Sequence, residues 1–323
     1  MKDILDFIIN FSAVLWEAMP FIVLGAVVAG ILEEFLPQQA ITKFLPKAVV
    51  PAVMIGAGLG LIFPMCECGI LVVMRRLLRK GLPLSCCVAY MLAGPIINPV
   101  VMFSTGVAFW PHGIGPEVLG LRVGLGFVVA VVTGLVVQQL WVKHGTALLN
   151  PIAVPAPAPE SKMSLPVADA PAARKPLSKR LGNISATAVH DFVDITVFLI
   201  LGSVLAAVAK LYITQDQIQY LSREQPFLAI PAMMALAVLM CLCSEADAFV
   251  AASFTNMHLS AKTAFLVLGP MLDLKLLLMY TRVFRPKLIG VIVACVVLQV
   301  LVYCVALHLV YQMNGWSGLP RSS

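Results

Sequence analysis

The chain has 323 residues, of which 60% are hydrophobic and 12% are charged, and its formal net charge is +6. A soluble globular chain is about half apolar and about a quarter charged, so this composition excludes an ordinary soluble domain and indicates an integral membrane protein. The apolar runs reach the roughly 20 residues of a membrane-crossing helix and lack the alternation of a β-barrel. The basic residues lie in short loops beside these runs, which indicates an orientation signal in the membrane and not a nucleic-acid surface.

Apolar segments follow one another along the chain, and each is expected to be a membrane-embedded helix. They cover residues 7–32, 48–65, 69–80, 84–107, 119–142, 189–212, 227–243, 246–257, 263–281 and 288–312. The segment 69–80 is too short to cross a bilayer and ends in the basic stretch RRLLRK. The pattern predicts an all-α polytopic membrane protein.

A change of composition separates the chain into two membrane halves. The stretch from 144 to 186 is rich in Pro, Ala and Ser and cannot bury enough apolar surface to fold, so it is predicted to be a flexible linker. The first membrane repeat then covers residues 1–143 and the second covers 187–314, followed by a tail over 315–323.

The two halves share motifs at a nearly constant offset, which predicts an internal duplication. MCECG (65–69) matches MCLCS (240–244), and AGPIIN (93–98) matches LGPMLD (268–273), both at an offset of 175 residues. Upstream, Gly25 matches Gly202 at an offset of 177. Duplicated units of this kind are a feature of transporter folds.

Topology decides how the halves are related. If both basic ends of 48–80 are cytoplasmic, this segment forms a re-entrant helical hairpin with Cys66-Glu67-Cys68 at its tip. Each half then has about three full crossings, and this odd number inverts the second half. The inverted repeat is preferred because it places more Lys and Arg on the cytoplasmic side. The alternative is a parallel repeat with eight spans.

Two Cys-x-Cys motifs stand at matched positions of the repeat. If their tips meet near the midplane of the membrane, Cys66, Cys68, Cys241 and Cys243 form a soft site that binds substrate, suited to a thiophilic metal ion or metalloid. Packing, a structural metal or a disulfide remain open for these thiols. The other cysteines have no repeat partner and are interpreted as packing residues.

Carboxylates within apolar sequence are costly in a bilayer and therefore candidates for function. Glu67, Glu245 and Asp247 lie at or beside the Cys motifs and are predicted to couple transport to protons. Asp273 and Lys275 lie within a later apolar run. The open alternative is that these groups face an aqueous cleft or form structural pairs.

Glycine and proline residues predict a break in one helix of each half. The helix-breaking residues are Gly94, Pro95 and Pro99 in the first half and Gly269 and Pro270 in the second. Broken helices expose carbonyls and half-helix ends, with which many transporters build their binding sites. Asn98 and Asp273 occupy equivalent places after the breaks and are predicted to bind substrate; a simple proline kink is the alternative.

These motifs resemble a bacterial family of predicted permeases that includes the trivalent organoarsenical efflux permeases. The resemblance rests on Pro-x-Cys-x-Cys (64–68), Gly-x-Pro-Leu (81–84) and Pro-x-x-Asn (95–98), and CSEADAF (243–249) indicates one subgroup. Glu67 and Gly69 stand where arsenical-type members tend to have Ser, which favours a cation or proton coupling. The resemblance implies a permease, with export as the expected direction, and a second small membrane protein as a partner.

The expected function is that of a secondary permease for a thiophilic metal, metalloid or thiol-type solute, located in the bacterial inner membrane. The chain is not expected to be an enzyme, because nucleotide-binding, zinc-protease and hydrolase motifs are absent from its sequence. Metal is expected only as cargo, and the partners are lipid, a small solute and either a second membrane protein or a further copy of the chain. The alternatives are a membrane thiol-disulfide redox protein and a subunit without transport of its own.

Overall fold

The computed structural model describes residues 2–35, 45–46, 48–150, 177–212, 226–254 and 257–315. Over these residues the chain is helical, with one isolated β-bridge between Leu149 and Phe284. The long helices are α1 (Lys2–Phe35), α7 (Gly115–His144), α8 (Leu177–Tyr212) and α14 (Pro286–Met313). The short helices are α3 (Val49–Gly58), η1 (Leu59–Leu61), α4 (Glu67–Arg79), α5 (Leu84–Ala93), α6 (Pro99–Phe109), η2 (Trp110–His112), η3 (Gly145–Leu148), α10 (Pro226–Met240), α11 (Asp247–Ser253), α12 (Leu259–Leu268) and α13 (Leu274–Val283).

The length and composition of the long helices confirm a polytopic membrane protein. Within the described residues, four helical stretches are long and apolar enough to cross a bilayer. They cover Phe7–Leu32, Gly115–Leu148, Gly182–Leu205 and Pro286–Met313. Each overlaps one of the longer segments expected from the sequence.

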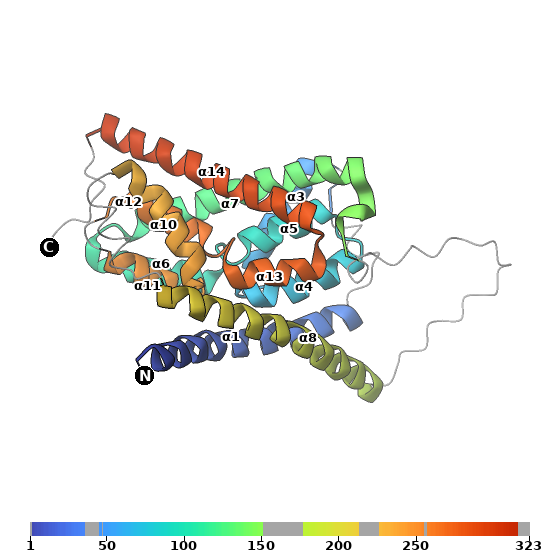
Figure 1. Cartoon of the computed structure of the whole chain (residues 1–323). Coiled ribbons are helices and arrows are strands. Elements are labelled where there is room, and N and C mark those ends of the chain that lie inside the picture. The colour runs from blue at the N-terminus through green and yellow to red at the C-terminus, as the bar shows by residue number, and fades with distance from the viewer. Residues whose placement is uncertain are drawn as a thin grey trace.

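The long helices lie on two sides of a layer of short helices (Figure 1). Helices α1 and α8 pack against each other on one side and run in opposite directions. Helices α7 and α14 pack on the other side, also in opposite directions. The short helices of both halves lie between them, and their buried side chains form one continuous apolar core.

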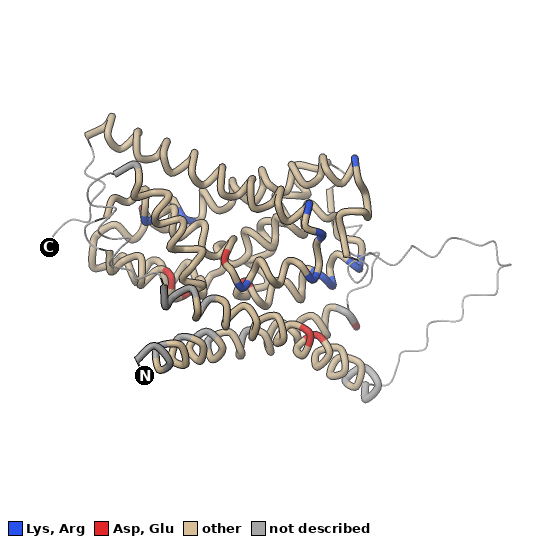
Figure 2. Tube along the Cα trace, viewed as in Figure 1, with Lys and Arg blue, Asp and Glu red and all other residues tan. Residues whose placement is uncertain are grey.

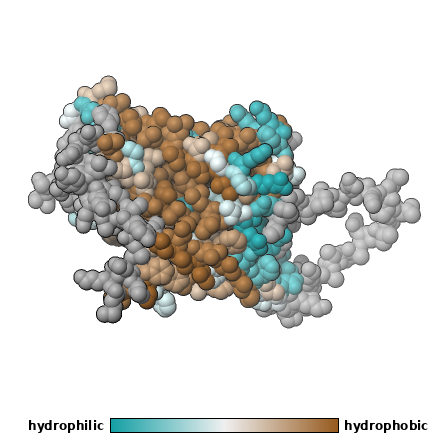
Figure 3. All heavy atoms as spheres, in the orientation of Figure 1, coloured by the Kyte–Doolittle hydropathy of each residue, from teal (hydrophilic) through white to brown (hydrophobic). Residues whose placement is uncertain are grey.

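The outer surface carries the apolar belt that a lipid environment requires. Large side chains face outward on several helices, including Trp16 (85% exposed), Phe103 (74%) and Leu298 (62%). Figure 3 shows hydrophobic residues in a broad band and hydrophilic residues along one edge. Lys and Arg gather on that same side, opposite the start of α1 and the end of α14 (Figures 1 and 2). The surface therefore defines one basic rim and one apolar belt.

Helices of the two halves begin and end at corresponding positions. Helix α5 covers 84–93 and α12 covers 259–268, so both boundaries differ by the offset of 175 residues seen in the motifs. The next helices, α6 and α13, start at Pro99 and Leu274, again 175 residues apart. The expected helix interruptions therefore lie at 94–98 and 269–273, where neither half continues as a single helix.

The predicted linker over 144–186 is too long at both ends. Leu148 and Leu149 are buried, and Asn150 donates hydrogen bonds to the carbonyls of Thr281 (2.6 Å) and Val283 (3.0 Å). These contacts fix the chain after α7 to the end of α13. At the other end, α8 already begins at Leu177. The remainder of the linker, residues 151–176, lies outside the described residues, as does most of the predicted tail.

Candidate functional site

The Cys66-Glu67-Cys68 motif lies at the buried start of a short helix. Cys66 is the N-cap residue of α4, and Glu67 is its first residue. Cys66 and Cys68 are 0% exposed and Glu67 is 2% exposed. A carboxylate in the first helical turn is stabilised by the positive end of the helix dipole. The fold therefore places Glu67 where a buried negative charge costs least.

A lysine from the second half is the partner of Glu67. Lys275 Nζ lies 3.1 Å from Glu67 Oε1 and 3.4 Å from Asp273 Oδ2. It also donates a hydrogen bond to the carbonyl of Cys241 at 3.3 Å. The side chains of all three charged residues are 1% exposed, so this ion-pair cluster is sealed from solvent. Lys275 therefore joins the broken helix of the second half to the tip of the first-half motif.

A second buried ion pair lies beside the first and also joins the halves. Arg122, in the first third of α7, donates to Asp247 Oδ2 at 2.8 Å, to the Ser244 carbonyl at 3.0 Å and to Thr105 Oγ1 at 2.7 Å. The Ser244 hydroxyl in turn donates to Glu67 Oε2 at 3.4 Å. Glu67 is within electrostatic reach of Asp247. The two ion pairs thus form one polar centre within the apolar core.

Four thiols surround this polar centre. Cys66 and Cys68 are hydrogen-bonded neighbours, and Cys243 is within electrostatic reach of both Cys66 and Lys275. Cys241 lies within reach of Asp273 and Lys275. All four are reduced and buried. The fold therefore gathers the sulfur atoms that the sequence places at the two motif tips.

The thiols do not form a ready-made metal site. Over the described residues, no group of three or more His, Cys, Asp or Glu side chains is placed to hold a metal ion. Cys241 has a positive φ of 48°, a conformation that costs energy for a residue with a side chain. This strained backbone directs the Cys241 carbonyl to Lys275. A soft cargo would have to draw the thiols together on binding.

Asn98 and Asp273 have the same structural role in the two halves. Asn98 is the N-cap residue of α6 and accepts a hydrogen bond from the Val100 amide at 2.9 Å. Asp273 is the N-cap residue of α13 and accepts from the Leu276 amide at 2.7 Å. Asn98 also donates to the Met65 carbonyl at 3.4 Å, which ties the break to the Cys motif. Both residues hold half-helix ends at the polar centre.

The other predicted site residues lie close by. Glu245 is in the turn before α11, half-buried and within electrostatic reach of Asp247. Of the helix-breaking residues, Gly94, Pro95 and Pro270 are buried, Gly269 is half-buried and Pro99 is exposed at the first position of α6. Proline fits this first helical position because its missing N–H would have no partner there.

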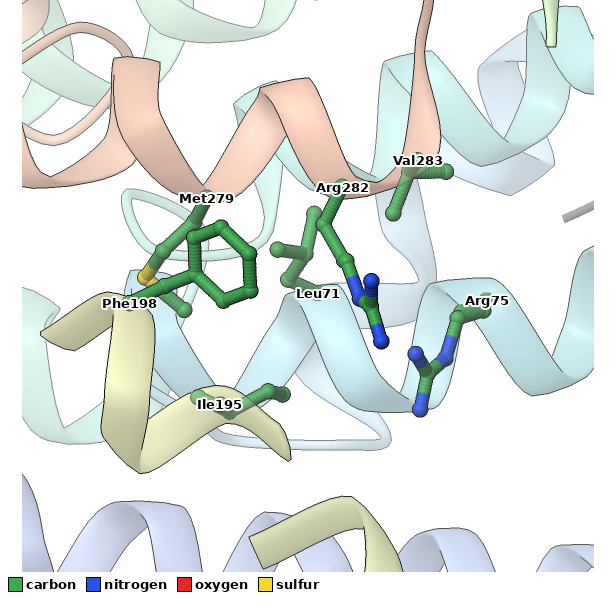
Figure 4. Close-up of a pocket in the computed structure, with 7 residues that line it drawn as sticks. All are labelled: Leu71, Arg75, Ile195, Phe198, Met279, Arg282 and Val283. Carbon is green, nitrogen blue, oxygen red and sulfur yellow. The ribbon is translucent and has the colours of Figure 1, made fainter. Parts of the chain in front are cut away.

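A further charged cluster lies toward the basic rim, between α4, α8 and α13. Asp191 accepts hydrogen bonds from Arg75 (2.5 Å) and Arg76 (2.7 Å) and is 0% exposed. Asp194, one turn later, is paired with Arg75 (2.8 Å) and Arg282 (2.6 Å). Figure 4 shows a pocket beside this cluster, into which Arg75 and Arg282 extend from different helices. Apolar side chains of α4, α8 and α13, among them Phe198 of α8, complete its lining.

Sequence reasoning missed the pairing of several of these residues. Asp191 is not among the predicted site residues and is fully buried. Arg122 carries no motif, although an arginine within an apolar span is itself a signal of function. The partners lie far apart in sequence, for example 208 residues for Glu67 and Lys275. Only the fold brings them together.

Comparisons with known proteins agree on one family. Residues 4–309 match the family model ArsP_1, which is described as a predicted permease. The chain is 34% identical over 296 residues to the UPF0718 protein YcgR of Bacillus subtilis (strain 168), covering 90% of this chain and 93% of that protein. It is 31% identical over 304 residues to a "Putative two-component membrane permease complex subunit" of Streptococcus mutans, covering 94% and 95%. No solved structure gives a significant match.

Proposed function

Because the chain belongs to the ArsP_1 family of predicted permeases, we propose that it is a secondary transporter that exports a small thiophilic solute without converting it chemically. The cargo class is a metal or metalloid species or a thiol compound. One observation carries the proposal: the Glu67–Lys275 ion pair joins the two halves at a buried centre that is surrounded by four thiols.

The ion pairs between the halves suggest how access would alternate. Glu67 belongs to the first half, whereas Lys275 and Ser244 belong to the second. Protonation of Glu67 would remove its charge and weaken its attraction to Lys275. The halves could then move relative to each other, while Asp273 remains beside the lysine at 3.4 Å. Glu67 is therefore proposed as the main proton-coupling residue, with Asp247 and Glu245 beside it.

The arrangement of the helices supports an inverted repeat with re-entrant hairpins. The equivalent helices α1 and α8 run in opposite directions, and so do α7 and α14 (Figure 1). Short helices that start within the core, such as α4 and α11, would form the hairpin tips. In this topology the basic rim faces the cytoplasm of a bacterial inner membrane.

The inverted topology predicts that the C-terminus lies in the periplasm. Two reporters are fused after Ser323 in separate variants, one that is active only in the periplasm and one that is active only in the cytoplasm. Only the periplasmic reporter is expected to be active. A second fusion within the loop that follows Arg79 is expected to give the opposite result, because that loop belongs to the basic rim. Cytoplasmic activity of the C-terminal fusion would exclude the inverted repeat and favour eight spans.

Transport is expected to depend on the central thiols. Serine keeps the size of cysteine but loses its affinity for soft ions, so Cys66→Ser and Cys241→Ser should each reduce export of thiophilic test solutes to background. Cys295→Ser is the matched control, because this half-buried thiol lies on α14 away from both motifs. The measurement is uptake into inverted vesicles with an imposed pH gradient. Normal transport by the double variant Cys66→Ser, Cys68→Ser would show that these thiols only pack.

A partner membrane protein is a further part of the proposal. One relative is named as a subunit of a two-component permease complex. The exposed apolar faces of this chain would permit such an association within the bilayer as readily as lipid contact. A second small membrane protein is therefore proposed to accompany the chain.

A further inference from the structure

Lys262 is a buried cation to which the mechanism above gives no role. It lies in the first turn of α12 and is 1% exposed. Its Nζ atom is buried and has no hydrogen-bond partner among the described residues. The group that it faces is the ring of Phe109 at the end of α6, with Nζ 5.8 Å from the ring centroid.

An unpaired buried ammonium group requires a physical explanation. Lysines near helix ends usually extend to the surface and keep the charge in water, but Lys262 is enclosed. Its burial without a hydrogen bond costs several kcal/mol, which a single weak contact with an aromatic ring does not offset. A buried polar group without a partner calls for an explanation, and a functional role that includes a bound ion is one of them. For an ammonium group, the ion is an anion.

Lys262 is also one of a series of buried cations. Arg122 contacts Thr105 of α6, and Phe109 follows Thr105 by four residues on the same helix. Residues four apart lie on the same face one turn apart, so Lys262 and Arg122 lie against neighbouring positions of α6. Arg122 in turn is linked through Ser244 to Glu67, the partner of Lys275. Lys262, Arg122 and Lys275 are therefore arranged one after another between the start of α12 and the polar centre.

The start of α12 offers a polar approach to Lys262. His258 is the N-cap residue of this helix and is half-buried, and its Nδ1 accepts the backbone N–H of Ser260 at 3.2 Å. His308 from α14 lies 3.3 Å from both His258 Nδ1 and the Ser260 hydroxyl. Since His258 and Lys262 are four residues apart, they lie on the same side of α12. Polar groups therefore extend from the surface toward the lysine.

We propose that Lys262 is an outer binding station for an anion, and that the cargo is a small anion that also carries a thiol, such as a thiol carboxylate. This inference rests on the proposed function, which includes thiol compounds in the cargo class. The Lys262 ammonium group binds the anionic group of the cargo at α12, which lies toward the end of α14 (Figure 1). Arg122 and Lys275 each have a carboxylate partner, whereas Lys262 Nζ has no hydrogen-bond partner among the described residues.

Three probe compounds distinguish the contribution of the negative charge to binding from the contribution of the thiol. Mercaptoacetate has both a thiol and a negative charge, 2-mercaptoethanol has only the thiol, and acetate has only the charge. Binding of each is measured by titration calorimetry on the purified full chain and on two variants, Lys262→Met and Lys262→Arg. Lys287→Met is the matched control, because this exposed lysine lies at the start of α14.

The expected result is a loss confined to the charged probes. Lys262→Met should weaken mercaptoacetate binding by about tenfold or more, the effect of one hydrogen bond to a charged group. Lys262→Arg keeps the charge and should retain most of the affinity, and Lys287→Met should bind as the wild type does. The ligand-free Lys262→Met variant should unfold at the same temperature or higher, because it no longer buries an unpaired charge.

The possible outcomes distinguish a failure of the proposed anion site at Lys262 from a failure of the proposed transport function. Unchanged mercaptoacetate binding in Lys262→Met, with binding still lost in Cys66→Ser, would overturn the station and leave the thiol site standing. Acetate and mercaptoacetate binding equally well, both through Lys262, would support the station and remove the thiol specificity. A lower unfolding temperature of ligand-free Lys262→Met would overturn the proposal, because it would assign the lysine a structural partner.

Discussion

Replacement of Lys275 by methionine is expected to lower the free energy of unfolding by about 3–5 kcal/mol and to abolish transport. Lys275 is the cation that faces both Glu67 (3.1 Å) and Asp273 (3.4 Å) within a fully buried cluster. Without it, two carboxylates remain in a core from which water is excluded. Both would have to take up protons or draw water into the core, and either change is costly.

A second substitution tests whether the loss arises from the unpaired carboxylate. Glu67→Gln in the Lys275→Met background removes one of the two buried charges and should restore a large part of the stability. Transport should remain absent, because neither the cation nor the titrating group is present. The measurements are chemical unfolding in detergent and transport in vesicles. A double variant no more stable than Lys275→Met would mean that Glu67 contributes little to the cluster.

The single variant Glu67→Gln tests the proton-coupling role of Glu67 separately from its structural role in the ion pair with Lys275. Glutamine keeps the shape of the side chain and can still accept a hydrogen bond from Lys275, and Asp273 remains as a counter-charge. This variant should therefore be far more stable than Lys275→Met, yet fail to drive transport with a pH gradient. Stability and transport thus respond differently to the two ends of one ion pair, which distinguishes a coupling role from a structural one.

The sequence alone singled out several residues that lie at the polar centre, but not Arg122, and it did not indicate how the charged residues pair. The matched Cys-x-Cys motifs and the high cost of a carboxylate in lipid were sufficient to select Cys66, Glu67 and their second-half counterparts. Proline residues located the helix breaks, because a proline removes a backbone donor and obstructs the preceding turn. These are local effects, and they can be inferred from a single segment of the chain.

Pairing depends on long-range packing, which no local pattern contains. Arg122 contacts Asp247, which lies 125 residues away, and Arg75 contacts Asp194, which lies 119 residues away. In both cases the sequence shows two charged residues in apolar surroundings but does not indicate which acid faces which base. The same limit explains the linker, because the buried contacts of Leu149 and Asn150 are made with the distant end of α13.

Gly202→Ala is expected to impair transport strongly, because this glycine lets α8 approach the backbone of Lys275. A Cβ atom added at Gly202 would lie 2.7 Å from the Cα atom and 2.8 Å from the Cβ atom of Lys275, both shorter than packed carbon atoms allow. Helices α8 and α13 must then separate, which would move Lys275 relative to Glu67. Overpacking of this kind costs about 1–3 kcal/mol.

Gly182→Ala is the control, since Gly182 lies on the same helix and has open space around it. In a helix alanine is favoured over glycine by about 1 kcal/mol, so this variant should be slightly more stable and transport normally.

Gly25 of α1, the repeat counterpart of Gly202, is also closely packed, but against α4: an added Cβ atom would lie 2.8 Å from the Cα atom of Gly69. Gly25→Ala should therefore impair transport as Gly202→Ala does. Transport by Gly202→Ala at the wild-type rate would contradict this prediction. It would mean that the position of Lys275 does not depend on the close approach of α8, and that the Glu67–Lys275 distance tolerates more movement than the coupling mechanism allows.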